Sequence, residues 1–259
     1  MDFLETLAGP GCTDGPFVAL VSPSVRELLS DSWGRINGLL KRLGARAVHA
    51  VDAGVEEFAR LSAAEAARKG GAVHVLSACP MAARFLAAKY PAYAGRLLAV
   101  PSPMAIQAKV ALAAAGIAEE GWALALTPCA FKRKETAAAG FDFRVVELRD
   151  FLAALRESGH SLDEEESLQY DALPPSADAH CVIAETVAAR AREIGLAART
   201  VKLNGSKEAI AFFENFSMGD PAQSAGSDTA FIEIAFCEGG CAHALEERRE
   251  SVPTEGVLP

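Results

Sequence analysis

The chain has 259 residues, a formal net charge of −9 and 51% hydrophobic residues, which is the composition of an ordinary globular protein. The acidic balance and the lack of a basic stripe argue against a nucleic acid partner, and no apolar stretch reaches the roughly 20 residues that span a membrane. Six cysteines without a secretory signal predict metal ligands and reduced thiols in the cytoplasm.

The first half of the chain alternates short apolar segments with segments of helical periodicity. After an extended lead-in over 1–16, the pattern predicts strands from 17 to a break at Pro23, and at 47–51, 74–77 and 97–100. Helical periodicity covers 25–40, 54–69, 80–90 and 103–115. Such alternation is typical of a mostly parallel sheet that is flanked by helices.

The second half continues in the same style, without a sequence repeat. Strands are predicted at 122–126, 143–146, 200–203 and 231–235, and helices at 132–139, 148–157, from 180 onward, and at 205–216. The acidic, proline-bearing stretch 158–179 predicts a surface loop, and 244–259 a frayed tail. We therefore expect an α/β fold of two lobes, 17–118 and 119–243, each a mostly parallel sheet flanked by helices.

Three of the predicted strands run into cysteines, which are Cys79, Cys129 and the pair Cys237 and Cys241. Ligands of open α/β sheets bind beyond the carboxyl ends of the strands. Four soft thiolates match the ligand demand of a four-iron (4Fe-4S) cluster, which we expect in a cleft between the two lobes. Cys12 and Cys181 have no motif partners and are predicted to be inert thiols.

Around these cysteines the sequence resembles the cluster-binding domain of iron-only (di-iron) hydrogenases. That family carries Thr-Ser-Cys-Cys-Pro, Met-Pro-Cys-x-x-Lys-x-x-Glu and Met-Ala-Cys-x-x-Gly-Cys in this order. The corresponding stretches here read Leu-Ser-Ala-Cys-Pro at 76–80, Thr-Pro-Cys-Ala-Phe-Lys-Arg-Lys-Glu at 127–135 and Ala-Phe-Cys-Glu-Gly-Gly-Cys at 235–241. Weaker matches extend the resemblance from about residue 17 to about residue 243.

The resemblance implies a four-iron cluster joined to a di-iron unit that bears CO, cyanide and a bridging dithiolate. By motif position, Cys79, Cys129 and Cys237 would hold the four-iron cluster, and Cys241 would both hold it and bridge to the di-iron unit. Lys132 would donate a hydrogen bond to one cyanide, which suits an ammonium group beside an anionic ligand. Glu135 completes the same motif.

The loop Ser22, Pro23 and Ser24 matches the family's segment that lines the other cyanide. A plain turn at the end of a strand is the alternative for this loop. The chain carries no run of cysteines ahead of the domain, so electrons would come from an external carrier such as ferredoxin or from a cluster-bearing partner subunit, with hydrogen as the other reactant.

The first motif departs from the family at Ala78, where relatives have a cysteine that relays protons. Alanine has no titratable atom, and a positioned general acid typically contributes about 10²–10⁴ in rate. The resemblance therefore implies reversible reaction with hydrogen at low turnover. The same loss is found in the hydrogen-sensing branch of the family, which makes hydrogen sensing the expected use.

Two alternatives use the same four thiolates. One is an iron–sulfur scaffold that binds only the four-iron cluster and has no hydrogenase activity; Ala78 favours it, whereas Lys132 and Glu135 do not. The other is a structural zinc site. The wide separation of Cys79, Cys129 and Cys237 argues against zinc, because zinc ribbons use closely spaced pairs.

Overall fold

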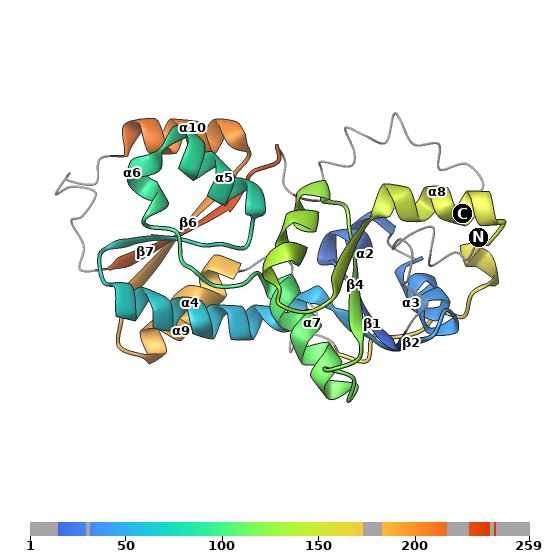
Figure 1. Ribbon diagram of the computed structural model, residues 1–259. Coiled ribbons are helices and arrows are strands. Elements are labelled where there is room, and N and C mark those ends of the chain that lie inside the picture. Colours follow the sequence, from blue (N-terminus) through green and yellow to red (C-terminus); the bar gives the residue numbers. More distant parts are fainter. Residues whose placement is uncertain (1–14, 30–31, 173–182, 217–227, 239–240, 242–259) are drawn as a thin grey trace. The chain divides into compact units, whose positions relative to one another are not determined.

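The computed structural model of the chain describes residues 15–29, 32–172, 183–216, 228–238 and 241 (Figure 1). Most of the expected lead-in, the expected tail, Cys12 and Cys181 lie outside the described residues. The described chain forms two compact units that interleave in sequence. The first unit takes residues 15–54 and 104–172, and the second takes 55–103, 183–216, 228–238 and 241.

The first unit is built on a parallel sheet in the order β2-β1-β4-β5. Its strands are β1 (Phe17–Val21), β2 (Ala45–Ala50), β4 (Trp122–Thr127) and β5 (Phe143–Glu147). Every residue of β1 and β4 is buried. Central strands of a parallel sheet are covered on both faces, which explains why these segments are continuous apolar runs rather than alternating ones.

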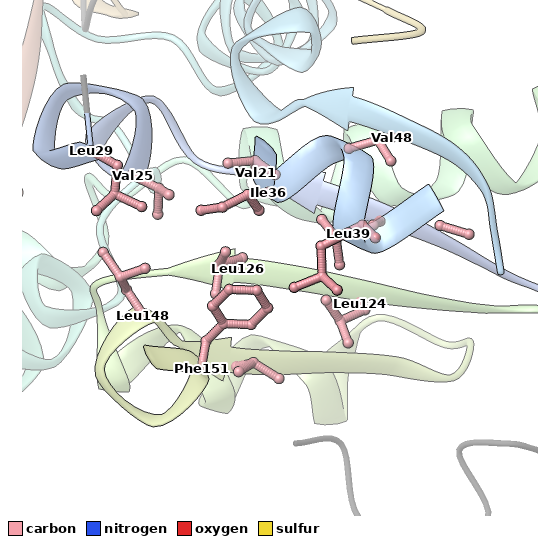
Figure 2. Packing of buried hydrophobic residues seen from close by; sticks show 14 of the residues in the cluster. Val21, Val25, Leu29, Ile36, Leu39, Val48, Leu124, Leu126, Leu148 and Phe151 are labelled. Atoms are coloured by element: carbon pink, nitrogen blue, oxygen red, sulfur yellow. The ribbon is translucent and has the colours of Figure 1, made fainter. Parts of the chain in front are cut away.

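Helices cover both faces of this sheet. One face carries α2 (Pro23–Leu29), α3 (Trp33–Arg42) and α8 (Leu148–Ser158), whose side chains meet those of the strands in the core of Figure 2. In that core, Ile36 and Phe151 are fully buried against Leu126. The opposite face is covered by α7 (Pro103–Ala114), which buries Ala108 and Leu112.

The second unit has a smaller parallel sheet in the order β3-β7-β6. Its strands are β3 (Val73–Val75), β6 (Ala198–Asn204) and β7 (Thr229–Ala235). On one face, α4 (Val55–Lys69) packs against α9 (Ile183–Glu193). The other face carries α5 (Pro80–Lys89), α6 (Pro91–Ala94) and α10 (Ser206–Asn215), as Figure 1 shows.

The predicted fold class is confirmed, since both units are mostly parallel sheets flanked by helices. The grouping of the strands differs from the expected lobes 17–118 and 119–243, because β3 pairs with β7 and β1 pairs with β4. Each sheet thus draws strands from both halves of the chain, and the crossovers that this requires are invisible in local periodicity. A cluster between two lobes stays a prediction.

Three local predictions also differ from the structure. The helical stretch 25–40 is divided into α2 and α3, and the segment 130–138 is a 3-10 helix, η2 (Ala130–Ala138). Residues 97–100 form only an isolated bridge, between Leu97 and Val75. In the described part of the chain, no helix is both long and apolar enough to cross a membrane.

The described part of the acidic stretch 158–179 is a largely exposed loop, as expected, and it is anchored to α3. It contains a short 3-10 helix, η3 (Leu162–Glu164), and the backbone nitrogen of Leu168 donates to the carbonyl oxygen of Gly34 at 2.9 Å. A methyl group at Gly38 would overlap the carbonyl oxygen of Glu166. Two glycines one turn apart therefore let the loop backbone approach the helix directly.

Candidate metal centre

The first group of predicted site residues lies at the carboxyl edge of the β2-β1-β4-β5 sheet. β1 leads to β2 on one side and β4 leads to β5 on the other, so the chain reverses direction across the sheet between β1 and β4. Val21 is paired with Leu126, and the backbone nitrogen of Ser22 donates to the carbonyl oxygen of Leu126 at 3.0 Å. Such a switch point is where open α/β sheets bind ligands.

The Ser22-Pro23-Ser24 turn begins α2, with Pro23 as its first residue. The hydroxyl groups of Ser22 and Ser24 are 3.2 Å apart and hydrogen-bonded, and Ser22 is buried. Proline is suited to the first turn of a helix because it has no backbone N–H to leave unsatisfied. The turn thus places two hydroxyl groups at the end of β1.

Cys129 follows the end of β4, and Lys132 follows within the same turn. The backbone nitrogen of Lys132 donates to the carbonyl oxygen of Cys129 at 3.2 Å. The ammonium Nζ of Lys132 donates to Oε1 of Glu135 at 2.6 Å, and the two side chains are only 16% and 15% exposed. Water screens such a pair less than one on the open surface, so Glu135 fixes the direction of the ammonium.

Arg133, the next residue, ties this turn to the neighbouring strand. Its guanidinium lies 2.6 Å from Oδ2 of Asp150 and 3.2 Å from Oε1 of Glu147, which is buried at the end of β5. Thr127 is the strand partner of Glu147 in the sheet. The sequence analysis did not single out this network, although an acidic residue ending an apolar strand was the available signal.

The second group lies at the carboxyl edge of the β3-β7-β6 sheet. Val75 is paired with Ile232, and the nitrogen of Leu76 donates to the carbonyl oxygen of Ile232 at 2.9 Å. This register places Cys79 and Cys237 just beyond the ends of two neighbouring strands. Cys79 is the N-cap residue of α5 and is half-buried, as is Cys237, whereas Cys241 is exposed.

Aromatic rings pack against one another next to this second edge. The ring of Phe236, which precedes Cys237, lies 5.0 Å from that of Phe85, and Phe85 lies 6.2 Å from Phe213. Cys79 packs against the same apolar core. Ala78 is half-buried in the turn between β3 and α5. The thiols of this edge therefore stand on an apolar base.

One charged residue of the second edge was not singled out from the sequence. The carboxylate of Glu238 accepts hydrogen bonds from the hydroxyl of Ser206 at 2.7 Å and from the backbone nitrogen of Lys207 at 3.2 Å. The hydrogen bond from Ser206, followed by that from Lys207, lowers the pKa of Glu238. The available signal in the sequence was the glycine at the predicted start of this helix. Gly205 has no side chain that could accept a hydrogen bond from the first N–H groups, so another residue must do so.

The donor set of the chain fits a four-iron cluster. Three of its thiols lie beyond strand ends: Cys129 after β4, Cys79 after β3 and Cys237 after β7. Among the described residues, no three His, Cys, Asp or Glu side chains converge closely enough to hold a single metal ion. The fit therefore rests on the chemistry of the donors, because a four-iron cluster takes four cysteine thiolates, one on each iron atom.

Comparisons with known proteins agree on one family and one fold. Residues 15–190 match the family described as iron only hydrogenase large subunit, C-terminal domain; Cys237 and Cys241 lie beyond that span. An apo FeFe-hydrogenase HydA1 variant from Chlamydomonas reinhardtii has a TM-score of 0.69 at 16% identity, over 99% of this chain and 88% of that chain. A second HydA1 variant from the same organism has a TM-score of 0.64 at 16% identity, over 99% of this chain and 83% of that chain.

A structure described in terms of stepwise assembly of the FeFe-hydrogenase H-cluster, HydA(deltaEFG), gives a TM-score of 0.63 at 16% identity, over 99% of this chain and 83% of that chain. At this identity the likeness shows the fold alone. No curated protein matches the chain.

Proposed function

Because the chain belongs to the family of the iron only hydrogenase large subunit, C-terminal domain, we propose that it binds a four-iron cluster linked to a di-iron unit and reacts reversibly with hydrogen at low turnover, as a hydrogen sensor. The ligands in this proposal are Cys79, Cys129, Cys237 and Cys241, the last of which also bridges to the di-iron unit. When bound, the cofactor would supply the metal at which hydrogen reacts and would relay electrons to and from the external carrier.

The observation that carries the proposal is the Lys132–Glu135 pair. The Lys132 side chain lies three residues after Cys129, is only 16% exposed, and its ammonium is 2.6 Å from the Glu135 carboxylate. A lysine on the open surface would be neither buried to this extent nor fixed in one direction. Burying a cation away from water is costly, and an anionic partner offsets that cost. A cyanide ligand would provide a second anionic acceptor for its three donors. A scaffold that binds only a four-iron cluster has no such acceptor.

The other residues of the first edge have supporting roles in this proposal. One of the hydroxyl groups of Ser22 and Ser24 would donate to the second cyanide, while the other donates to it across the 3.2 Å between their oxygens. Arg133, through Glu147, holds the turn that carries Lys132 against β5.

The second edge accounts for the low turnover in the proposal. Ala78 stands directly before Cys79 and cannot hold a proton, so a proton must reach the reacting atoms through water, which is slower than transfer from a positioned acid. Electrons would come from an external carrier such as ferredoxin or from a cluster-bearing partner subunit. Slow turnover suits a protein that reports hydrogen rather than one that consumes it.

Infrared spectroscopy of protein matured with the di-iron precursor tests the proposal. We expect CO and cyanide stretches, which have no counterpart in protein vibrations. Lys132→Met should lower retention of the di-iron unit by about 10–100-fold, as loss of a hydrogen-bonding partner of a metal ligand typically does. Lys134→Met, at an exposed lysine of the same 3-10 helix, is the matched control and should leave the spectrum unchanged.

A protein that binds four irons but shows no CO or cyanide stretches would contradict the proposal. The scaffold function would then replace it.

A further inference from the structure

Helix α10 begins at a residue that cannot cap it. The N-cap residue Gly205 has no side chain and a φ of 98°, so it offers no oxygen to the first N–H groups of the helix. Glu208, in the first turn, accepts a hydrogen bond from the backbone nitrogen of Asn204 at 2.5 Å. Because this contact engages Glu208 with the end of β6, the N–H groups at the start of α10 need a different acceptor.

Glu238 is that acceptor, and it comes from the loop between two of the predicted cluster ligands. Its carboxylate accepts hydrogen bonds from the hydroxyl of Ser206 at 2.7 Å and from the backbone nitrogen of Lys207 at 3.2 Å. Because helix N-termini carry partial positive charge, a carboxylate is favoured in this position. The loop therefore supplies the cap that Gly205 lacks.

Gly205 is fitted to this arrangement in two ways. A side chain is strained at its positive φ, and a Cβ there would lie 2.5 Å from Oε2 of Glu238. The backbone nitrogen of Gly205 also donates to the carbonyl oxygen of Ala235 at 2.8 Å. The chain around Cys237 is thus attached to the start of α10 on both sides, at Ala235 and at Glu238.

We propose that Glu238 is a positioning residue for the metal cluster: it anchors the chain next to Cys237 to the N-terminus of α10, so that the Cys237 thiolate is held in place before a cluster binds. This inference rests on the proposed function, because it takes Cys237 as a ligand. Ordering a loop costs conformational entropy, and an anchor that orders it beforehand removes this cost from cluster binding.

The anchor also keeps the carboxylate away from the metal. A carboxylate flanked by two thiolates adds negative charge beside an anionic cluster, and its oxygens are themselves potential metal ligands. Hydrogen bonds from Ser206 and Lys207 engage those oxygens and offset their charge. Glu238 acts through the position of its neighbours rather than through contact with the cluster.

Two measurements on four single variants and one double variant test this inference. Hydrogen exchange of the amides of 237–241 is followed in the apo-protein, and loss of the reconstituted four-iron cluster to a chelator is followed by absorbance and iron content. Glu238→Ala should exchange faster in this loop and lose the cluster about 10-fold faster, the lower end of what outer contacts of metal ligands contribute. Glu238→Gln should lie between it and the natural protein, because the amide oxygen still accepts.

The remaining variants separate anchoring from helix stability. Ser206→Ala should weaken cluster retention alone but add nothing in the Glu238→Ala background, because the partner is already gone. Glu208→Ala is the matched control, since it removes a different contact at the start of α10 and does not touch the loop. Its cluster retention should equal that of the natural protein.

The outcomes are distinct. If the natural protein takes up the cluster and Glu238→Ala exchanges and retains iron as the natural protein does, the inference is wrong and the proposed function stands. The same holds if Glu208→Ala is as damaging as Glu238→Ala. If the natural protein takes up no four-iron cluster, the proposed function fails first and the inference fails with it.

Discussion

The two sheet edges have the same architecture and opposite chemistry. The edge of β1 and β4 carries one thiol, Cys129, among hydroxyl groups and charged side chains that are paired with one another. The edge of β3 and β7 carries two thiols, Cys79 and Cys237, beside a set of aromatic rings. The first edge is suited to hydrogen-bonding an anionic ligand, and the second to binding soft metal through sulfur.

The edges also differ in what holds them in place. In the first unit, Arg133 connects the Lys132 turn to Glu147 and Asp150, so directional charge pairs fix the geometry. In the second unit, Phe85 and Phe236 fix the strand ends through packing. Charge pairs respond to salt and to removal of one partner, whereas packing responds to lost volume. Substitutions can therefore separate the two edges.

The largest expected effect comes from removing a thiolate. Cys79→Ala and Cys129→Ala should each abolish the four-iron chromophore, because every iron of the cluster needs its own protein ligand. Iron per chain and visible absorbance after reconstitution measure this. Cys12→Ala and Cys181→Ala are the controls and should bind iron normally. Full iron content in Cys129→Ala, or zinc in place of iron, would show that the first edge contributes no ligand.

The sequence was sufficient to predict seven strands and the thiols that follow three of them, although the predicted strand at 97–100 is only an isolated bridge. β1 and β4 are apolar runs bounded by proline, and such runs identify strands that are covered on both faces. It was not sufficient for the strand partners. Nothing in the period of 73–75 distinguishes pairing with β7 from pairing with β1, because the choice is made by the packing of whole units.

Contacts made by side chains across distant segments were missed for the same reason. Glu238 reads as a polar residue in a loop, and only the structure places it at the start of α10. The approach of Glu166 to Gly38 depends on two segments more than a hundred positions apart in the chain. Lys132 and Glu135 were singled out by their match to the family motif, and the structure adds the ion pair between them.

The next effect in size separates the two cores. Phe213→Ala should destabilise the apo-protein by about 3–5 kcal/mol, as loss of a buried ring typically does. It should also speed hydrogen exchange around Cys79 and Cys237, because Phe85 loses a packing partner. Phe151→Ala, in the core of the first unit, is the matched control. It should cost similar stability, measured by urea unfolding, without changing exchange at the second edge.

Equal exchange at Cys79 and Cys237 in the two variants would mean that the aromatic rings do not support the thiols. The second edge would then depend on its backbone hydrogen bonds alone.

A smaller effect concerns Ala78. If the missing proton relay limits turnover, Ala78→Cys should raise hydrogen evolution by about tenfold or more, which corresponds to about 1.4 kcal/mol off the barrier. A thiol has a reference pKa near 8.5 and can donate and accept protons, whereas a methyl group cannot. The measurement is gas-phase hydrogen from a reduced dye, at equal iron content. Ala83→Cys, three residues into α5, is a control for an added thiol elsewhere.

An unchanged rate in Ala78→Cys with the di-iron unit present would place the limitation elsewhere. Electron entry from the external carrier would then be the better explanation.

The smallest expected effect compares one buried histidine in each unit. His49 on β2 is hydrogen-bonded to Gln107 at 2.8 Å, and His74 on β3 lies near the ring of Phe231. Burial lowers the pKa of both. At His74, Lys69 and Arg96 lower the pKa further, and a backbone hydrogen bond with Gly71 and the charge of Glu65 oppose them. At His49, Asp171 opposes the effect of burial and Lys41 adds to it.

These shifts give the apo-protein a pH-dependent stability of known sign. Where the folded pKa lies below the unfolded value of about 6.5, the unfolded state binds protons first, so stability is complete above that pH and falls as the pH falls towards the folded value. Each unit of difference in pKa contributes about 1.4 kcal/mol. Each histidine should therefore remove stability from its own unit as the pH falls below about 6.5. Hydrogen exchange resolved by unit measures this: His74→Gln should flatten the pH dependence of the second unit, and His49→Gln that of the first. A pH dependence that neither substitution changes would show that other groups set it.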